Sequence, residues 1–525
     1  MAKFLSLSAF ILFQLFSIEA LKTCIPKNFP NLLQAQNIVC VCNSTYCDEF
    51  PPLGQLQTGE AAIYTTSRNG KRFERRTEQF QLSAGNSTTR VTIDPSHTYQ
   101  TIIGFGGAFT DSAGVNMNRL SANARQNLLK AYFSEEGIGY NLARVIMASC
   151  DFSPRVYSYD DLYADPLQGN LGNLLGSAGG LILRPTDFEL EKFNLTSEDF
   201  TLKLPHIKTA LKMAAERGDP LKLFASPFSA PAWMKLTGFM EGGGPLLGDV
   251  TGPYYKTWAE YFVRFFEEYA KEGVEFWGLT MQNEPLVSAA IIWWQGTFFT
   301  AEMQRDFLKL WLGPALKNSS VAQNVKVMIM DDQRTFLPEF PNTVLSDPGA
   351  AQYVDGIGVH WYFDIATDPQ TTLVATHDDH PDIFLLGTED MQNWVAGWTE
   401  WNLCLDEQGG PTWVTTAIHG LDSTIIVNNT VDEFYKQPTY YVIGHFSKFV
   451  PAGSVRVDMA IEHSPLATGL DGLAFINPAN HMVLVLHNKN ALVDFHVSIE
   501  DTSNPDAFLQ LDIEALSIVT VVWRN

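Results

Sequence analysis

Eight short apolar runs, rich in β-branched and aromatic residues, recur along the middle of the chain. Continuous apolar runs of this length are typical of parallel strands that are buried on both faces. Segments with the apolar periodicity of a helix lie between most of them, for example 257–273 and 301–316. This alternation predicts an α/β fold with a closed (β/α)8 TIM barrel over residues 99–450. The eight runs are 101–109, 140–149, 221–228, 274–282, 325–332, 354–362, 383–389 and 394–403.

A different pattern occupies both ends of the chain. Residues 48–98 and 451–525 alternate apolar and polar positions, with turn residues between the alternating stretches. Alternation with a period of two is typical of antiparallel strands that have one face in a core and one face in water. We therefore expect one all-β sandwich that is built from both chain ends.

The barrel pattern is broken at two places. Residues 163–183 are rich in Gly and Leu and show no periodicity, which indicates a loop insertion. Four residues alone separate Glu389 from Trp394, whereas neighbouring parallel strands need a crossover of about a dozen residues or more. Either the last two strands are not neighbours, or the seventh crossover helix has been lost.

The N-terminus has the pattern of a secretory signal peptide over residues 1–20. Lys3 precedes an apolar stretch that runs to residue 16, and Ala20 is a small residue at a plausible cleavage point. No later run approaches the roughly 18 apolar residues of a membrane-spanning helix. Five N-x-S/T sequons follow the signal peptide, which fits a secreted or lysosomal glycoprotein. They begin at Asn43, Asn86, Asn194, Asn318 and Asn428.

Four of the six cysteines fall within residues 21–47, which we interpret as a disulfide-knotted segment. The simplest pairing is Cys24 with Cys40 and Cys42 with Cys47. A zinc site is the alternative, but an oxidising compartment and the lack of nearby histidines disfavour it. Cys150 and Cys404 are expected to be free. The net charge of −23 argues against a nucleic-acid partner.

Two glutamates stand where predicted barrel strands end. Glu284 precedes Pro285, which cannot continue a strand ladder, and Glu389 closes the run 383–389. Catalytic groups of TIM barrels stand at this end of the strands, and glycoside cleavage requires two carboxyl groups. Glu400 rivals Glu389 on spacing alone.

Other strand ends carry aromatic, amide and charged residues, as a carbohydrate cleft does. The candidates for sugar binding are Arg144, Asp151, Trp233, Asn283, His360, Tyr362 and Trp401. Motifs of serine hydrolases, zinc proteases and phosphate-binding loops do not occur. His377 and His380 have a spacing that could hold a metal, although a solvated turn is the simpler interpretation. The aromatic stretch 291–299 is either a packed loop or a contact for a lipid tail or membrane surface.

The chain resembles the acid glucosylceramidases, the lysosomal β-glucocerebrosidases, over nearly its whole length. The resemblance is carried by GFGGAFTDSA, ASPFSAPAWMK, NEP, MIMDDQR, GVHWY, GWTEWNL and FYKQPTYYVIGHFSKF. It implies a retaining hydrolase that removes β-linked glucose from glucosylceramide without a metal or other cofactor. Glu284 matches the acid/base of that family, Glu389 the nucleophile, and the seven sugar-binding candidates match positions that shape the glucose pocket. The resemblance also implies a peripheral enzyme of the lysosome lumen that works with a saposin-type activator and anionic lipid.

Both breaks in the barrel pattern are also departures from this family. The family lacks the insertion, and it carries a further segment between its nucleophile and the last barrel strand. Our hypothesis is that a skipped exon or a gene-model error shortened this connection and that a retained intron supplied the insertion. If the shortened product is real, a catalytically impaired isoform that binds carbohydrate or lipid is the alternative function. A related β-glycosidase with another sugar specificity is the third.

Overall fold

The computed structural model describes residues 21–30, 36–162, 185–289, 293–387, 391–414, 422–462 and 468–524. The predicted signal peptide, the whole of the expected insertion and Glu389 lie outside the described residues. Every helix among the described residues is too short or too polar to cross a bilayer.

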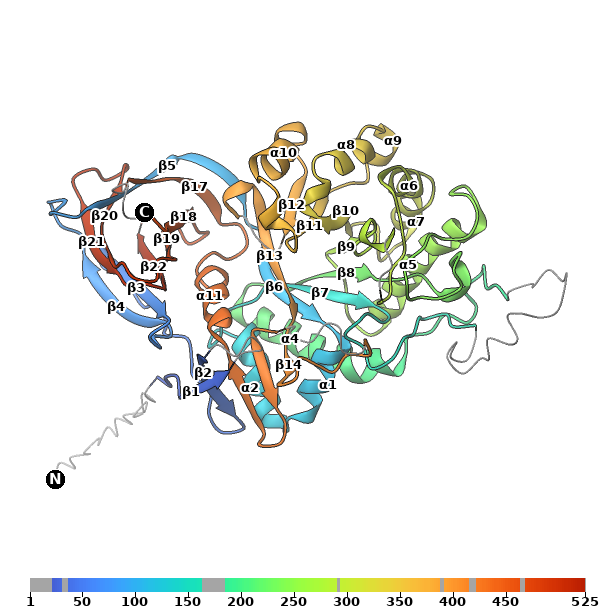
Figure 1. Cartoon of the computed structure of the whole chain (residues 1–525), viewed down its shortest axis with the longest axis horizontal. Coiled ribbons are helices and arrows are strands. Elements are labelled where there is room, and N and C mark those ends of the chain that lie inside the picture. Colours follow the sequence, from blue (N-terminus) through green and yellow to red (C-terminus); the bar gives the residue numbers. More distant parts are fainter. Residues whose placement is uncertain are drawn as a thin grey trace, which may run out of the picture.

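The eight predicted apolar runs form a closed barrel of eight parallel strands, so this part of the prediction is confirmed (Figure 1). Each strand pairs with its neighbours in chain order, and the last strand pairs with the first. The strands are β6 (Gly104–Phe109), β7 (Leu142–Met147), β8 (Lys222–Pro227), β9 (Gly278–Thr280), β10 (Lys326–Gln333), β11 (Gly356–His360), β12 (Phe384–Gly387) and β13 (Val395–Asn402).

Helices surround the barrel and bury one face against it (Figure 1). In α5 (Pro253–Lys271), Trp258, Phe262, Phe265 and Tyr269 are buried at helical spacing, which explains the periodicity of 257–273. The segment predicted as one helix over 301–316 is interrupted by a π-helical turn at Leu308–Leu312. The other helices are α1 (Asp111–Arg119), α2 (Ala122–Phe133), α4 (Leu204–Arg217), α6 (Ala301–Phe307), α7 (Gly313–Asn318), α8 (Glu339–Leu345), α9 (Pro348–Ala351), α10 (Ala375–Asp379) and α11 (Pro438–Ser447).

The pairing of β12 with β13 excludes the first of the two alternatives for the short link, that the last two strands are not neighbours. The two strands are neighbours and parallel, with Leu385 opposite Val395 and Gly387 opposite Trp398. The paired part of β12 is short, so the chain that follows it has to run back along only a few residues of β12 before it can pair with this strand as β13. In the described part of this connection the helical element is a 3-10 turn at Met391–Asn393. The barrel therefore closes here without the usual α-helical crossover.

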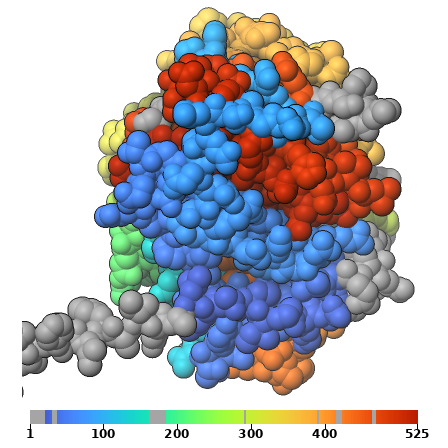
Figure 2. Space-filling model, turned by 90° about the vertical axis from the view of Figure 1, so that its left-hand side faces the viewer, coloured from blue at the N-terminus to red at the C-terminus, as the bar shows by residue number. Residues whose placement is uncertain are grey.

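The chain ends form a nine-stranded sheet, as predicted. Figure 2 shows N-terminal and C-terminal residues lying against one another on this side of the molecule. In β22 (Ser517–Arg524) Val519, Val521 and Trp523 enter the sandwich core, and the alternate residues Ile518 and Val522 join the core of the barrel. Apart from the buried Thr520, the run from Ile518 to Trp523 is apolar because both faces of the strand are buried. The sheet order is β21 (Phe508–Ile513), β20 (Phe495–Asp501), β5 (Thr89–Thr101), β17 (Val455–Glu462), β18 (Leu470–Ile476), β19 (His481–Asn488), β22, β3 (Glu60–Ser67) and β4 (Glu74–Gln79).

A third sheet, which the sequence pattern did not predict, holds the cysteine-rich segment. The disulfides are Cys24–Cys40 and Cys42–Cys47, as predicted. Because Cys42 and Cys47 are bonded to each other, the zinc alternative is wrong. Cys150 and Cys404 are free and buried. The sheet order is β1 (Pro26–Pro30), β2 (Gln36–Asn43), β16 (Glu433–Lys436), β15 (Ile425–Asn428) and β14 (Leu405–Asp406).

Candidate active site

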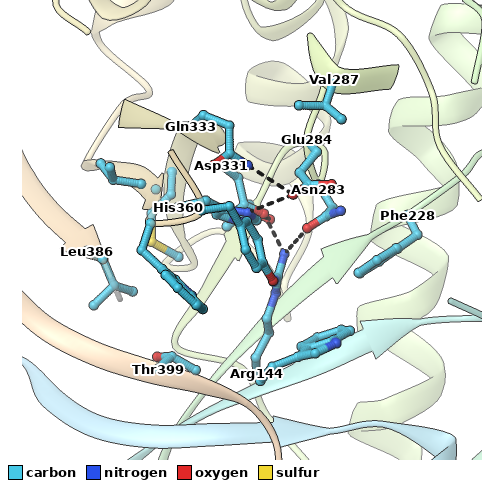
Figure 3. Close-up of a pocket in the computed structure, with 18 of the residues that line it drawn as sticks. Arg144, Phe228, Asn283, Glu284, Val287, Asp331, Gln333, His360, Leu386 and Thr399 are labelled. Atoms are coloured by element: carbon cyan, nitrogen blue, oxygen red, sulfur yellow. Dashed lines mark hydrogen bonds and ion pairs between the residues drawn. The ribbon is translucent and has the colours of Figure 1, made fainter. Parts of the chain in front are cut away.

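A cavity of about 380 Å³ lies among the barrel strands and the loops that follow them (Figure 3). Six of the seven predicted sugar-binding residues line it, together with Glu284. The six come from separate parts of the sequence and are brought together by closure of the barrel. They are Arg144, Asp151, Asn283, His360, Tyr362 and Trp401.

The backbone around Glu284 is held by the two neighbouring strands. The Asn283 N–H donates to the Pro227 carbonyl (2.9 Å), and the Glu284 N–H donates to the Asp331 carbonyl (2.9 Å). Glu284 has a φ of 45°, in the left-handed region that residues with a Cβ rarely adopt. Such strained residues persist only where the surroundings hold them, and they cluster at functional sites. The backbone of the barrel therefore fixes the position of the Glu284 carboxyl group.

Asp331 is the hub of a buried hydrogen-bond network that the sequence did not reveal. Its Oδ2 accepts from Arg144 Nη2 (2.7 Å) and from Thr280 Oγ1 (2.6 Å), and its Oδ1 lies 3.0 Å from His360 Nε2. Burial alone would raise the pKa of Asp331, but Arg144 and His360 outweigh it and hold that pKa at about 2. The carboxylate therefore stays ionised between two cationic side chains.

His360 links this hub to Glu284. Its Nδ1 lies 3.2 Å from Glu284 Oε1, on the opposite side of the ring from Asp331. Burial lowers the pKa of His360, but the hydrogen bonds to Asp331 and Glu284 more than compensate and raise it to about 9. At neutral and acidic pH both ring nitrogens consequently carry protons and donate to the two carboxyl groups.

A β-bulge in β10 determines which of its polar side chains enter the cavity. The pairing with β11 shifts between Met330 and Asp332, and Met330 and Asp331 have φ angles of 66° and 58°. Asp331 and Gln333 line the cavity. Asp332 instead accepts from the N–H groups of Leu286 (2.7 Å) and Val287 (3.3 Å) and so fixes the loop after Glu284.

Two further acidic residues line the cavity. Burial, followed by the charge of Glu284, raises the pKa of Asp151 to about 7, and Asp151 Oδ1 has no hydrogen-bond partner among the described residues. Glu400 of β13 accepts from the Trp401 N–H (2.9 Å), and burial, followed by the charge of Asp422, raises its pKa. In slightly acidic solution Asp151 therefore favours its neutral form, and burial shifts Glu400 in the same direction.

Trp401 and Phe228 form an aromatic wall. Their rings stack with centroids 5.5 Å apart, and the Arg144 guanidinium lies 5.5 Å from the Trp401 ring. Phe228 was missed as a site residue, although it directly follows the last residue of β8. Trp233, which was predicted to shape the sugar pocket, does not line the cavity. It is 1% exposed, packs against Phe188, and donates its indole N–H to the Asp160 carbonyl (3.1 Å).

The remaining predicted positions lie away from the cavity or outside the described residues. His377 stacks on Trp394, and His380 hydrogen-bonds Asn342 at 2.6 Å. Asn86, Asn194 and Asn318 are exposed, whereas Asn43 and Asn428 are half-buried. Glu389 lies outside the described residues, and Gly387, two positions earlier in the sequence, ends β12 and lines the cavity. A separation of about 5–5.5 Å between the Glu284 and Glu389 carboxyl groups, the spacing of retaining enzymes, stays a prediction.

Sequence comparison identifies relatives over the whole chain. The "Glycosyl hydrolase family 30 TIM-barrel domain" matches residues 102–171, 183–392 and 389–450, and the "Glycosyl hydrolase family 30 beta sandwich domain" matches residues 453–521. The first match breaks inside the expected insertion and again at the short connection after Glu389. "Putative glucosylceramidase 4" of Caenorhabditis elegans is 44% identical, with 99% of each chain covered. "Lysosomal acid glucosylceramidase" of Mus musculus is 39% identical, also with 99% of each chain covered.

Solved structures share the same architecture. SrfJ from Salmonella typhimurium aligns with a TM-score of 0.75 at 24% identity, covering 89% of this chain and 100% of that one. An endo-β1,6-glucanase aligns with a TM-score of 0.72 at 25% identity and the same coverage. Because the family match spans the barrel and the sandwich and the relatives cover the full length, this chain is a glycoside hydrolase that belongs to glycosyl hydrolase family 30.

Proposed function

We propose that this glycosidase is a retaining β-glucosidase that hydrolyses glucosylceramide to glucose and ceramide. The observation that carries the proposal is a cavity with one glutamate held by the barrel backbone, an aromatic wall and buried polar atoms that lack partners. Asp151 Oδ1 and Thr399 Oγ1 both belong to residues that line the cavity, and both are unpaired among the described residues. Buried polar atoms are normally hydrogen-bonded, so hydroxyl groups of a bound sugar are their natural partners. The choice of glucosylceramide as the substrate is supported by the names of the relatives in Caenorhabditis elegans and Mus musculus.

Glu284 is suited to the acid/base role by the way its carboxyl group is held. Both side-chain contacts of Glu284 in the described structure, from Gln333 Nε2 (3.1 Å) and His360 Nδ1 (3.2 Å), involve Oε1. Oε2 is thus left to carry the proton that is transferred to the leaving oxygen.

The reaction we propose is a double displacement. Glu389 attacks the anomeric carbon, and the bond to the ceramide oxygen breaks as Glu284 protonates that oxygen. Water then attacks the glucosyl-enzyme, gives its proton to Glu284 and releases glucose and the Glu389 carboxylate. Arg144, Asp331 and His360 act by keeping Glu284 and the cavity wall in place.

We assign the nucleophile to Glu389 and not to Glu400. A nucleophilic carboxyl group must be ionised at the working pH, and burial of Glu400, which has no cationic partner among the described residues, favours its protonated form. The assignment of Glu389 itself depends on the resemblance of LLGTE to the nucleophile motif of glucosylceramidases.

Exposed apolar side chains around the cavity support a lipid substrate and peripheral membrane association. Trp361 (43% exposed) and Phe363 (53% exposed) line the cavity, and Ile365 nearby is fully exposed. Trp293 (68% exposed) is next to Trp294, another lining residue. Such a group of side chains favours insertion into the surface of a lipid layer. A saposin-type activator, anionic lipid and the lysosome lumen are part of this proposal, by similarity to the mouse relative.

Azide rescue tests the two catalytic roles separately. With an activated aryl β-glucoside and azide, Glu284→Ala should yield the β-glucosyl azide and Glu389→Ala the α-glucosyl azide. Production of the α-azide by Glu400→Ala instead would transfer the nucleophile role to Glu400. Glu272→Gln, which removes a surface carboxylate paired with Lys208, is the matched control and should retain full activity.

Substrate comparison tests the specificity. Wild-type protein should release glucose from glucosylceramide in mixed micelles faster than it cleaves the galactosyl or xylosyl analogues. No turnover of either lipid or aryl β-glucoside by the wild type would favour the catalytically impaired isoform. The short connection between β12 and β13, whose described part holds a 3-10 turn, is the feature that makes this alternative worth testing.

A further inference from the structure

Gln333 is a buried amide at the edge of the cavity to which no role has been assigned. It is the last residue of β10, lies opposite His360 in the sheet register, and is 1% exposed. Its Nε2 donates to Glu284 Oε1 (3.1 Å). Its Oε1 has no hydrogen-bond partner among the described residues, although Gln333 lines the cavity. One end of this amide is thus occupied by Glu284, and the other end is open.

The orientation of the amide follows from its partner. A carboxylate only accepts hydrogen bonds, so the NH2 group of Gln333 has to face Glu284 and the carbonyl oxygen has to face away from it. An unpaired buried acceptor is costly, and native proteins seldom retain one unless a ligand or water completes it. Gln333 Oε1 therefore requires a hydrogen-bond donor, an N–H or O–H group.

The position of Gln333 indicates which part of the substrate supplies this donor. Figure 3 shows Gln333 beside Glu284 on one side of the cavity and Thr399 on the opposite side. In the proposed reaction, the acid/base group contacts the glycosidic oxygen from the leaving-group side. A neighbour of Glu284 therefore meets atoms of the leaving group close to that oxygen.

We propose that Gln333 selects the leaving group: its Oε1 accepts a hydrogen bond from an N–H or O–H donor on the carbon next to the one that bears the glycosidic oxygen. The amide N–H of a ceramide is such a donor, whereas a simple alkyl alcohol has none. This inference rests on the proposed function, since it assigns a subsite of the same cavity. The favoured substrates are glucosides of N-acylated amino alcohols.

Substrates that differ only in the donor test this in the wild type. Glucosylceramide is compared with its N-methyl-amide analogue and with an alkyl β-glucoside of matched chain length, all in the same mixed micelles. We expect kcat/KM to be about tenfold or more higher for the substrate with the N–H, which is the selectivity that one hydrogen bond to a buried acceptor provides. Equal kcat/KM values for the N–H and N-methyl substrates would overturn the inference.

Gln333→Met separates selection of the leaving group from positioning of Glu284. Loss of the hydrogen bond to Glu284 lowers kcat/KM for every substrate alike, whereas loss of the acceptor lowers only the preference for the donor. We expect the ratio between the two substrates to fall to about one. A preserved ratio, with both rates reduced, would show that Gln333 only positions Glu284.

Gln333→Asn serves as the second variant, because it keeps a polar side chain but withdraws the carbonyl oxygen from the cavity. It should lose the same preference, and an unchanged preference in this variant would also count against the inference. If the wild-type protein cleaves no aryl β-glucoside at all, the proposed β-glucosidase function is refuted, and the role of Gln333 is refuted together with it. Cleavage of the aryl glucoside without discrimination between the two lipids overturns only the role of Gln333.

Discussion

Replacement of Asp331 by asparagine should be among the most damaging single changes in the barrel. The substitution preserves the shape of the side chain and removes the negative charge that lies between Arg144 and His360. Both cationic partners are nearly buried, at 8% and 9% exposure, so water cannot take over the role of Asp331. Removal of one partner from a buried ion pair typically costs about 3–5 kcal/mol of unfolding free energy.

The raised pKa of His360 gives a second estimate of the stabilisation that is lost when Asp331 is replaced. A shift of the His360 pKa from 6.5 to about 9 corresponds to about 3 kcal/mol of preferential stabilisation of its charged form, shared between Asp331 and Glu284. Because the folded pKa is raised, this stabilisation is fully present below about pH 6.5 and is lost as the pH rises through about 9. The difference between wild type and Asp331→Asn should therefore narrow at high pH. It should not vanish, because Arg144 stays charged.

Guanidinium unfolding, followed by tryptophan fluorescence at pH 5.5 and pH 9.5, measures both effects. Asp471→Asn is the control, since Asp471 pairs with Lys489 through side chains that are 47% and 57% exposed. An exposed pair of this kind contributes less than about 1 kcal/mol. The reasoning is refuted if Asp331→Asn destabilises no more than the control. If Asp331→Asn lowers the unfolding free energy by the same amount at both pH values, the contribution assigned to His360 is refuted.

Three further predictions concern the cavity wall, pH and lipid. Phe228→Ala should lower kcat/KM for a β-glucoside about tenfold through loss of the stacked wall, while Trp233→Phe should leave KM unchanged. Steady-state kinetics of the two variants measure both effects. Equal effects of the two substitutions on KM would contradict the placement of the two rings. Burial raises the pKa values of Asp151, Asp160 and Asp332 to about 7 each. The folded state therefore holds these protons more tightly than the unfolded state does, and the free energy of unfolding should decrease as the pH rises from about 4 to about 7. The thermal midpoint should accordingly be higher at pH 5 than at pH 7.5, with a smaller difference in Asp332→Asn, and the reverse order would contradict the sign. Replacement of Trp293 and Ile365, which do not line the cavity, by serine should abolish sedimentation with anionic vesicles but leave hydrolysis of a soluble aryl glucoside intact. Retained sedimentation would exclude these side chains as the lipid contact.

The amino-acid sequence by itself determined the strands of the barrel and the place of Glu284. Strands that are buried on both faces have to be apolar along their whole length, so the eight runs could be found without knowledge of their neighbours. Pro285 places Glu284 in the loop after β9, which ends at Thr280, because proline has no N–H to give to a ladder. The disulfide pairing was also accessible, since four cysteines lie close together in the sequence.

Tertiary structure alone decided which side chains meet. A bulge in β10, visible only in its pairing with β11, aims Asp331 and Gln333 into the cavity and turns Asp332 toward the Glu284 loop. Phe228 and Trp233 are five positions apart after the same strand, and only the path of the loop assigns one to the cavity and the other to the core. The closure of β12 onto β13 likewise depends on strand register, because register sets how far the connecting chain must travel. Apolar periodicity reports the burial of each residue but not its partner, and the chemistry of this site depends on partners.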